Sequence, residues 1–199
     1  MKHRIILAST SPRRAALLKQ IGISFVVIAS NFEEVTQIKN PTIRSVKQMI
    51  TTNAKGKALA VAKTQQGMII GVDTVVFYHG ELIGKPKDNK DALRILKMLN
   101  GTKHKILSAI AVVKNNQKEQ RVITDCVVSE VSMRKASEKE LQEYVQTGEP
   151  LDKAGAYGVQ ERGAIFIKHI HGDYYNIVGL PLVKLLEMCK KLGVDLLTL

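Results

Sequence analysis

Apolar residues recur along the chain with two spacings, one typical of helices and the other of strands. The stretch 42–64 places them every three or four positions, as a helix with one buried face does: Val46, Met49, Ile50, Ala54, Ala58 and Val61. The same reasoning predicts helices over 12–21, 88–99, 137–146 and 181–191. Runs rich in β-branched residues predict strands over 4–8, 24–30, 68–78, 105–113, 121–131 and 164–170.

Two helix starts and one helix end carry clear local signals. Ser11 followed by Pro12 fits an N-cap and the first helical position, and Gly22 can end that helix. Ser137 and Glu140 have the spacing of a capping box, in which each side chain bonds the other residue's backbone N–H. These signals set the ends of two of the predicted helices.

Hairpins interrupt the alternation of strands and helices. His79-Gly80 lies between two β-rich runs, and the turn-like 114–118 lies between two long alternating ones. Strands joined by hairpins are antiparallel, whereas strands joined through helices are usually parallel. We therefore expect an α/β fold with a mixed sheet, forming one domain over 1–199 in which about 81–135 makes a smaller lobe.

Composition favours a partner that carries negative charge. The 199 residues have a net charge of +12, which suits nucleic acid, a nucleotide phosphate or an acidic membrane surface. The lysines are scattered, and with no Trp, four Phe and five Tyr the chain has few residues on which bases could stack, so nucleic acid is open but not favoured. No apolar run is long enough to span a membrane, and Cys126 and Cys189 suggest reduced thiols of a cytoplasmic protein.

Arg13 and Arg14 lie in the first turn of the predicted helix 12–21. A helix N-terminus attracts anions, so two cations there are unfavourable unless an anion lies in front of them. Arginine grips phosphate oxygens through two parallel N–H groups. The alternative is a pair of exposed arginines matched with surface carboxylates, and the dipole argument alone does not separate the two.

Three acidic residues elsewhere in the chain are candidates for catalysis or metal binding. Asp73 interrupts the apolar run "GVDTVV", where an unpaired carboxylate is costly to bury. It either pairs with a Lys or Arg or faces a metal or a water at a strand end. Lys85 follows the predicted hairpin, which would fold it back toward Asp73, and this favours the second interpretation. Glu33 and Glu34 are adjacent carboxylates of the kind that bind Mg²⁺ together with substrate phosphates, although such pairs are also common on surfaces.

A glycine-punctuated stretch follows the fourth predicted helix. The segment 148–160 combines three glycines with Asp152, Lys153 and Gln160, whose side-chain amide can read a base edge. The bland alternative is a plain connector. His169 and His171 share one face of a predicted strand, but without further ligands they do not make a metal site.

Taken in order, these motifs resemble the Maf family of nucleoside triphosphate pyrophosphatases over nearly the full length. The resemblance rests on "LASTSPRR", "GVDTVV" followed by "GKP", "LNGTKH", "EPLDKAGAYGVQ" and "GDYYNIVGLPL". It implies an elongated mixed sheet flanked by helices, with two lobes and a cleft, as in Maf and inosine triphosphate pyrophosphatase-like proteins. It also implies a homodimer that needs Mg²⁺ or Mn²⁺ and cleaves dTTP and UTP between the α- and β-phosphates.

Site residues follow from the same resemblance. It implies that Asp73 is the catalytic carboxylate and that Glu34 and Asp73 hold the metal. It implies that the substrate and specificity positions are Ser9, Arg13, Arg14, Lys57, Thr74, Lys85, Asp152, Lys153 and Gln160.

Two departures from the family pattern bear on specificity. Glu161 and Arg162 follow Gln160 where the family usually has a glycine, and Ser108-Ala109 replaces a usual Thr-Gly. These departures leave open the same reaction on a modified pyrimidine triphosphate or on a modified or non-canonical purine nucleotide. The net charge of +12 leaves open a second alternative, a non-enzymatic nucleic-acid-binding or cell-division regulator.

Overall fold

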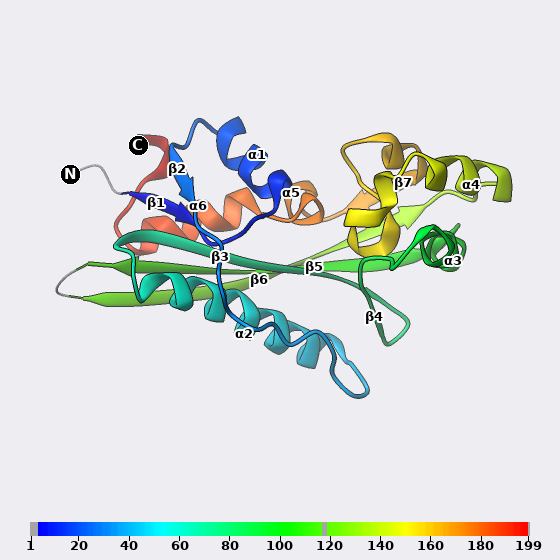
Figure 1. Ribbon diagram of the computed structural model, residues 1–199. Coiled ribbons are helices and arrows are strands. Elements are labelled where there is room, and N and C mark those ends of the chain that lie inside the picture. The colour runs from blue at the N-terminus through cyan, green and yellow to red at the C-terminus, as the bar shows by residue number, and fades with distance from the viewer. Residues whose placement is uncertain (1–3, 117–118, 199) are drawn as a thin grey trace.

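The structure, a computed structural model, describes residues 4–116 and 119–198, and its strands form one mixed sheet (Figure 1). The strand order is β2-β1-β3-β5-β6-β7. The short β4 pairs with the end of β3, on the same edge that β1 pairs with further back. The strands are β1 (Ile5–Leu7), β2 (Phe25–Val27), β3 (Gly67–Tyr78), β4 (Glu81–Ile83), β5 (Lys103–Asn115), β6 (Gln120–Met133) and β7 (Ile167–His171).

The pairing confirms the mixed sheet predicted from the sequence. β1 runs parallel to both β2 and β3, whereas β4, β5, β6 and β7 all join by antiparallel pairing. The β3–β4 hairpin turns at His79 and Gly80, both with positive φ. The β5–β6 hairpin pairs continuously out to Asn115 and Gln120, and residues 117 and 118 of its turn lie outside the described residues.

Helices cover both faces of this sheet. They are α1 (Pro12–Gln20), α2 (Ile43–Ala62), α3 (Asn89–Leu99), α4 (Glu138–Gln146), α5 (Tyr174–Val178) and α6 (Leu182–Lys191). Figure 1 shows α2 beneath the long strands and α1 and α6 above them. The capping box of Ser137 and Glu140 is formed as predicted. Among the described residues, no helix combines the length and apolar character that crossing a membrane requires.

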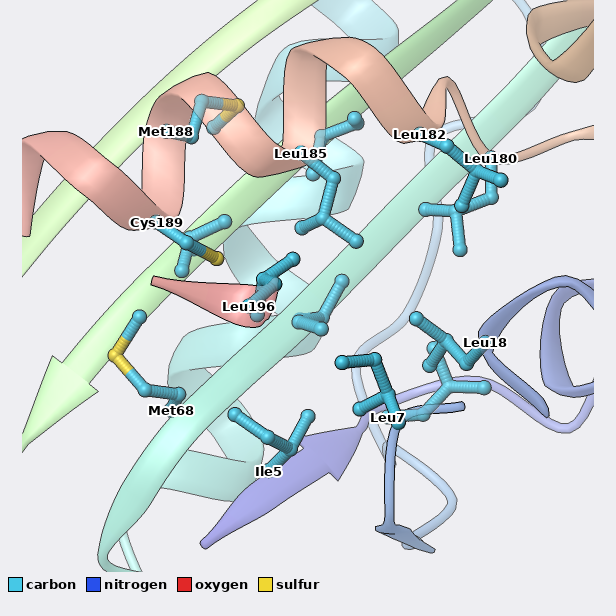
Figure 2. Packing of buried hydrophobic residues seen from close by; sticks show 14 of the residues in the cluster. Ile5, Leu7, Leu18, Met68, Leu180, Leu182, Leu185, Met188, Cys189 and Leu196 are labelled. Atoms are coloured by element: carbon cyan, nitrogen blue, oxygen red, sulfur yellow. The ribbon is translucent and has the colours of Figure 1, made fainter. Parts of the chain in front are cut away.

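Alternating residues of β3 feed different cores. Met68, Ile70 and Val72 pack with β1, α1 and α6 in a first core, whose side chains Figure 2 shows converging from these elements. On the same face but at the other end of the sheet, Val76 joins α3 and α4 in a second core. Ile69 faces the opposite way, into a third core between the sheet and α2. The sheet therefore carries two separate cores on one face.

Close backbone contact holds α2 against the sheet. Gly71 of β3 lies under α2 so tightly that an added Cβ would come within 2.2 Å of the Ala54 carbonyl oxygen. Gly56, on the same helix, faces the ring of Phe32, which belongs to the loop before α2. These contacts fix the distance between α2 and β3 and therefore the position of the polar side chains between them.

Three segments differ from the sequence-based expectation. The second predicted strand, 24–30, shortens to Phe25–Val27. The predicted strand 164–170 begins only at Ile167, because residues before it form a 3-10 helix, Arg162–Phe166. The short helix α5 was not predicted; Asp173 caps it through the Tyr175 N–H, and Gly179 ends it with a φ of 119°. Ser108 and Ala109 pair in continuous register with β3, without a bulge.

We predict that Gly71→Ala lowers the free energy of unfolding by about 1–3 kcal/mol, because the new methyl group overlaps the backbone of α2. Gly84→Ala is the matched control, since a Cβ there meets nothing within 4 Å. Denaturant unfolding of the three proteins measures the difference. Equal stability of the two variants would contradict this packing.

Candidate active site

A cleft of about 620 Å³ lies at the edge of β3, and its lining takes residues from all three cores. Its walls come from the loop after β1, the loop before α2, and the residues that follow α4. All the positions that the resemblance assigned to a site line it: Ser9, Arg13, Arg14, Glu34, Lys57, Asp73, Thr74, Lys85, Asp152, Lys153 and Gln160. Glu33, the neighbour of Glu34, does not line it. Arg13 and Asp73, far apart in sequence, thus share one cavity.

The floor of the cleft is a polar break in an apolar sheet face. Thr74 of β3 pairs with Ser108 of β5, and their hydroxyl oxygens lie 2.9 Å apart. The next residues on this face belong to the first core on one side and to the second core on the other. The polar pair therefore marks where the two cores part.

The edge of β3 is open at the same level. β1 pairs with β3 only as far as Ile70, and β4 begins to pair at Val76. Between these points the carbonyl oxygen of Val72 accepts hydrogen bonds from Arg14 Nη1 at 3.2 Å and from Lys57 Nζ at 3.3 Å. Because one cation comes from α1 and the other from α2, the opening is reached from both faces of the sheet.

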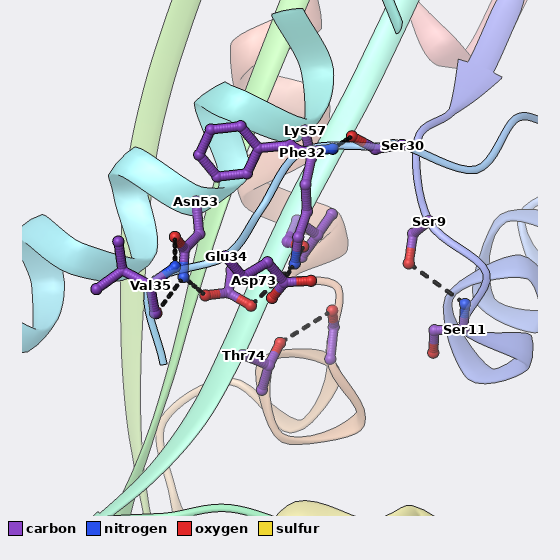
Figure 3. Close-up of polar contacts among 12 residues, drawn as sticks. Ser9, Ser11, Ser30, Phe32, Glu34, Val35, Asn53, Lys57, Asp73 and Thr74 are labelled. Carbon is purple, nitrogen blue, oxygen red and sulfur yellow. Dashed lines mark hydrogen bonds and ion pairs between the residues drawn. The ribbon is translucent and has the colours of Figure 1, made fainter. Parts of the chain in front are cut away.

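Asp73 faces α2 rather than the polar floor. It is 7% exposed, and it accepts a hydrogen bond from Lys57 Nζ at 3.1 Å and one from Asn53 Nδ2 at 2.8 Å (Figure 3). The same Lys57 Nζ lies 2.7 Å from Glu34 Oε2, and Glu34 is half exposed. Two carboxylates from separate segments therefore converge on one ammonium group.

Glu34 and Asp73 are two carboxylates that line the cleft and share one cation, Lys57. Within residues 4–116 and 119–198, no group of three or more His, Cys, Asp and Glu side chains gathers as a metal site. Hard ions such as Mg²⁺ need only one or two carboxylates when substrate phosphates and water complete the shell. Because both carboxylates already meet at one cation, the donor set fits such an ion.

The Arg14 guanidinium is largely committed to the protein. Nε donates to the Gly179 carbonyl at 2.9 Å, Nη1 to Ser9 Oγ at 2.8 Å, and Nη2 to Thr74 Oγ1 at 3.1 Å. Burial lowers the pKa of Arg14 to about 10, although Asp73 opposes the shift, so the group stays charged at neutral pH. Arg14 thus ties α1 to β3 and contributes a fixed positive charge.

Arg13 behaves differently, because it reaches across the cleft. Its Nη1 lies 2.7 Å from Asp152 Oδ2, and Asp152 Oδ1 accepts from Lys153 Nζ at 2.7 Å. Burial raises the pKa of Asp152, but hydrogen bonds from Lys153 and Arg13 outweigh it and hold that pKa below its ordinary value. An ion pair therefore joins the α1 side of the cleft to the loop on the other side.

One carboxylate shapes that loop. Glu149 accepts hydrogen bonds from Tyr144 Oη at 2.8 Å and from the backbone N–H groups of Arg162 and Gly163, each at 3.0 Å. Lys153 Nζ, itself buried, adds the Glu149 carbonyl at 2.9 Å and Glu161 at 3.2 Å. These contacts fix both ends of the loop and leave the exposed Gln160 between them, on the cleft.

Sequence reasoning missed Asn53 and Glu149. Asn53 lies four residues before Lys57 on α2, so the two side chains share one helix face. A buried asparagine inside an apolar stripe was the available signal, since such an amide must find partners. Glu149 gave no such signal, because its partners lie on a loop whose path depends on the whole fold.

Comparison with known proteins identifies close relatives. The family model of Maf-like proteins matches residues 4–192. The chain is 50% identical over 198 residues to a dTTP/UTP pyrophosphatase of Dictyoglomus turgidum, covering 99% of this chain and 100% of that protein. It is 43% identical over 191 residues to a dTTP/UTP pyrophosphatase of Aquifex aeolicus, covering 96% of each. The structure of the Staphylococcus aureus Ham1 protein matches 96% of this chain and 100% of its own, at 18% identity and a TM-score of 0.45.

We predict that the two neighbouring arginines differ in their effect on stability. Arg14→Lys lowers the free energy of unfolding by about 1–3 kcal/mol, because a lysine cannot satisfy the acceptors that the planar guanidinium now serves. Arg13→Lys changes it by less than about 0.5 kcal/mol, since its ion pair is partly exposed. Urea unfolding of both variants gives the comparison; a larger loss in Arg13→Lys would be inconsistent with these contacts.

Proposed function

Because the chain belongs to the Maf family, we propose that it is a nucleoside triphosphate pyrophosphatase acting on dTTP and UTP. The products are the nucleoside monophosphate and pyrophosphate. The observation that carries the proposal is the single cleft that holds Arg13 and Arg14 beside Asp73. The relatives that bear this activity in their names, 40–50% identical over nearly the whole chain, support the same substrates.

The reaction needs water to attack a phosphorus atom that is shielded by negative charge. A bond forms between the water oxygen and the α-phosphorus, and the bond from that phosphorus to the bridging oxygen of the β-phosphate breaks. Catalysis of such a step is mostly positioning and charge neutralisation. We assign Asp73 to orient the water and accept its proton, since it is the buried carboxylate of the cleft.

Cations on both sides of the open β3 edge serve the phosphate chain. Lys57 approaches from α2, Arg13 lines the cleft from α1, and the exposed Lys85 lines it from the segment after β4. Arg13 exchanges its Asp152 partner for phosphate oxygens, which its forked geometry suits. Arg14, Ser9 and Thr74 act as one hydrogen-bonded unit that keeps the α1 N-terminus facing the substrate.

A divalent cation, Mg²⁺ or Mn²⁺, completes the proposed site. Glu34 and Asp73 would hold it, with Lys57 free to turn toward the phosphates. When bound, such an ion neutralises phosphate charge and stabilises the leaving pyrophosphate.

The loop after α4 is the proposed base-recognition wall. Gln160 offers a side-chain amide on the cleft, and Asp152 and Lys153 hold the loop in place. Glu161, next to Gln160, is directed toward Lys153 by an ion pair at 3.2 Å, so the residue that departs from the family pattern has a partner of its own.

Three further properties belong to the same proposal. We expect one functional domain over 1–199, in which the segment from about 81 to 135 shares the sheet through β5 and β6. We also expect a homodimer in the cytoplasm. The thiols of Cys126 and Cys189 are free, which suits a reducing compartment.

A panel of triphosphates tests the function. With Mn²⁺ or Mg²⁺ present, we expect pyrophosphate release from dTTP and UTP to exceed that from purine triphosphates, and a chelator to abolish it. Asp73→Asn keeps the size of the side chain and removes its charge, so turnover falls by about 10³-fold or more while the protein remains folded and still binds nucleotide. Near-normal turnover in Asp73→Asn, or salt-sensitive DNA binding without hydrolysis in the native protein, would refute the assignment.

Base selection has its own test. In Gln160→Ala, the kcat/KM for dTTP divided by the kcat/KM for CTP or a purine triphosphate should change by a large factor. The rate of hydrolysis summed over all these triphosphates should fall by a smaller factor. Gln146→Ala, an exposed glutamine at the end of α4, is the matched control. An unchanged substrate profile in Gln160→Ala would remove Gln160 from base recognition.

A further inference from the structure

Asn53 is a buried amide whose hydrogen bonds connect two separate parts of the candidate site. It is 1% exposed, and its Nδ2 donates to Asp73 Oδ2 at 2.8 Å and to the Val35 carbonyl at 2.9 Å. Its Oδ1 accepts from the Val35 N–H at 3.0 Å. Both ends of the amide are therefore in use, as Figure 3 shows.

The contact with Val35 fixes the loop that carries Glu34. Val35 directly follows Glu34, and Asn53 bonds both its N–H and its C=O, as a neighbouring strand would. The loop before α2 contains no helix or strand between β2 and α2; besides Asn53, the packing of Phe32 on Gly56 and the ion pair of Glu34 with Lys57 hold it to this helix. The direction of Glu34 thus depends on Asn53.

The hydrogen bond from Asn53 to Asp73 fixes this second carboxylate relative to the same Asn53 side chain. Lys57, one turn further along α2, contacts Glu34 at 2.7 Å and Asp73 at 3.1 Å. Removal of the amide would leave Lys57 as the remaining link between the two carboxylates. A cation that replaced Lys57 would then meet two carboxylates without a fixed separation.

We propose that Asn53 is a positioning residue that holds the Glu34 loop and Asp73 at the separation needed for both carboxylates to bind one divalent cation. Its consequence for catalysis rests on the proposed function. Groups that orient metal ligands without touching the metal commonly change metal affinity or activity by about 10–100-fold when they are removed.

The first test compares two asparagine variants. Asn53→Leu removes all three hydrogen bonds and keeps a similar volume. The control is Asn115→Leu: Asn115 also bonds backbone of the α2 region, through Nδ2 to the Ala62 and Gln65 carbonyls, but it lies outside the cleft. Titration calorimetry with MnCl₂ on the nucleotide-free proteins should show about tenfold weaker binding in Asn53→Leu and a change within about twofold in the control.

Kinetics supply a readout that a merely structural role would not move. In Asn53→Leu, kcat for dTTP should fall by about tenfold or more with a much smaller change in KM. In the Glu34→Gln background the same substitution should lower kcat by no more than about threefold, because one of the two carboxylates whose separation Asn53 sets is already lost. Equal factors in both backgrounds, or an unchanged Mn²⁺ affinity, would overturn the proposal.

Two arrangements keep the test decisive. If Asn53→Leu does not fold, Asn53→Ser replaces it, since a hydroxyl group cannot reach all three partners; the same results are expected and the same results overturn the proposal. If the native protein releases no pyrophosphate from any triphosphate, the proposed function fails, while the MnCl₂ titration still decides the role of Asn53.

Discussion

The meeting of Glu34, Lys57 and Asp73 at the open edge of β3 is the interaction on which the rest of the site depends. A buried carboxylate is stable only when it is paired and hydrogen-bonded, so Asp73 requires α2 to lie at a fixed distance from the sheet. The close contacts at Gly71 and Gly56 set that distance. Stability and chemistry are thus linked: the packing that allows a carboxylate inside the protein also brings it toward the cleft.

The cleft follows from how the sheet divides its hydrophobic surface. The first and second cores occupy opposite ends of one face, and Thr74 and Ser108 separate them with hydroxyl groups. A continuous apolar face would have drawn α1 and the loop after α4 together. The polar break leaves room between them, and the Arg13–Asp152 ion pair is the link across that room.

Much of the fold was predictable from the sequence, because amphipathic spacing and caps act locally. The helices α1, α2, α3, α4 and α6 and both hairpins were predicted with nearly their observed bounds. The short α5 was missed, since five residues give little periodicity and its cap, Asp173, looks like a turn residue. The strand before it was predicted too long because its first residues belong to a 3-10 helix, whose Arg162 and Gly163 N–H groups donate to the distant Glu149, a contact that no local pattern indicates. The predicted site residues lie together on the cleft, yet the division of labour between Arg13 and Arg14 depends on the position of Gly179, which is far along the chain.

Between Ile70 and Val76, β3 has no partner strand among the described residues on the edge that it shares with β1 and β4, and this opening has a consequence for solubility. Exposed strand edges can recruit strands from other molecules and so begin aggregation. Here the opening is only a few residues long, and the ammonium and guanidinium groups of Lys57 and Arg14 already occupy its Val72 carbonyl from above and below. An incoming backbone would have to displace both cations. The positive charges of Lys57 and Arg14, which suit a small anionic ligand, therefore also oppose the addition of a strand from another molecule to this sheet.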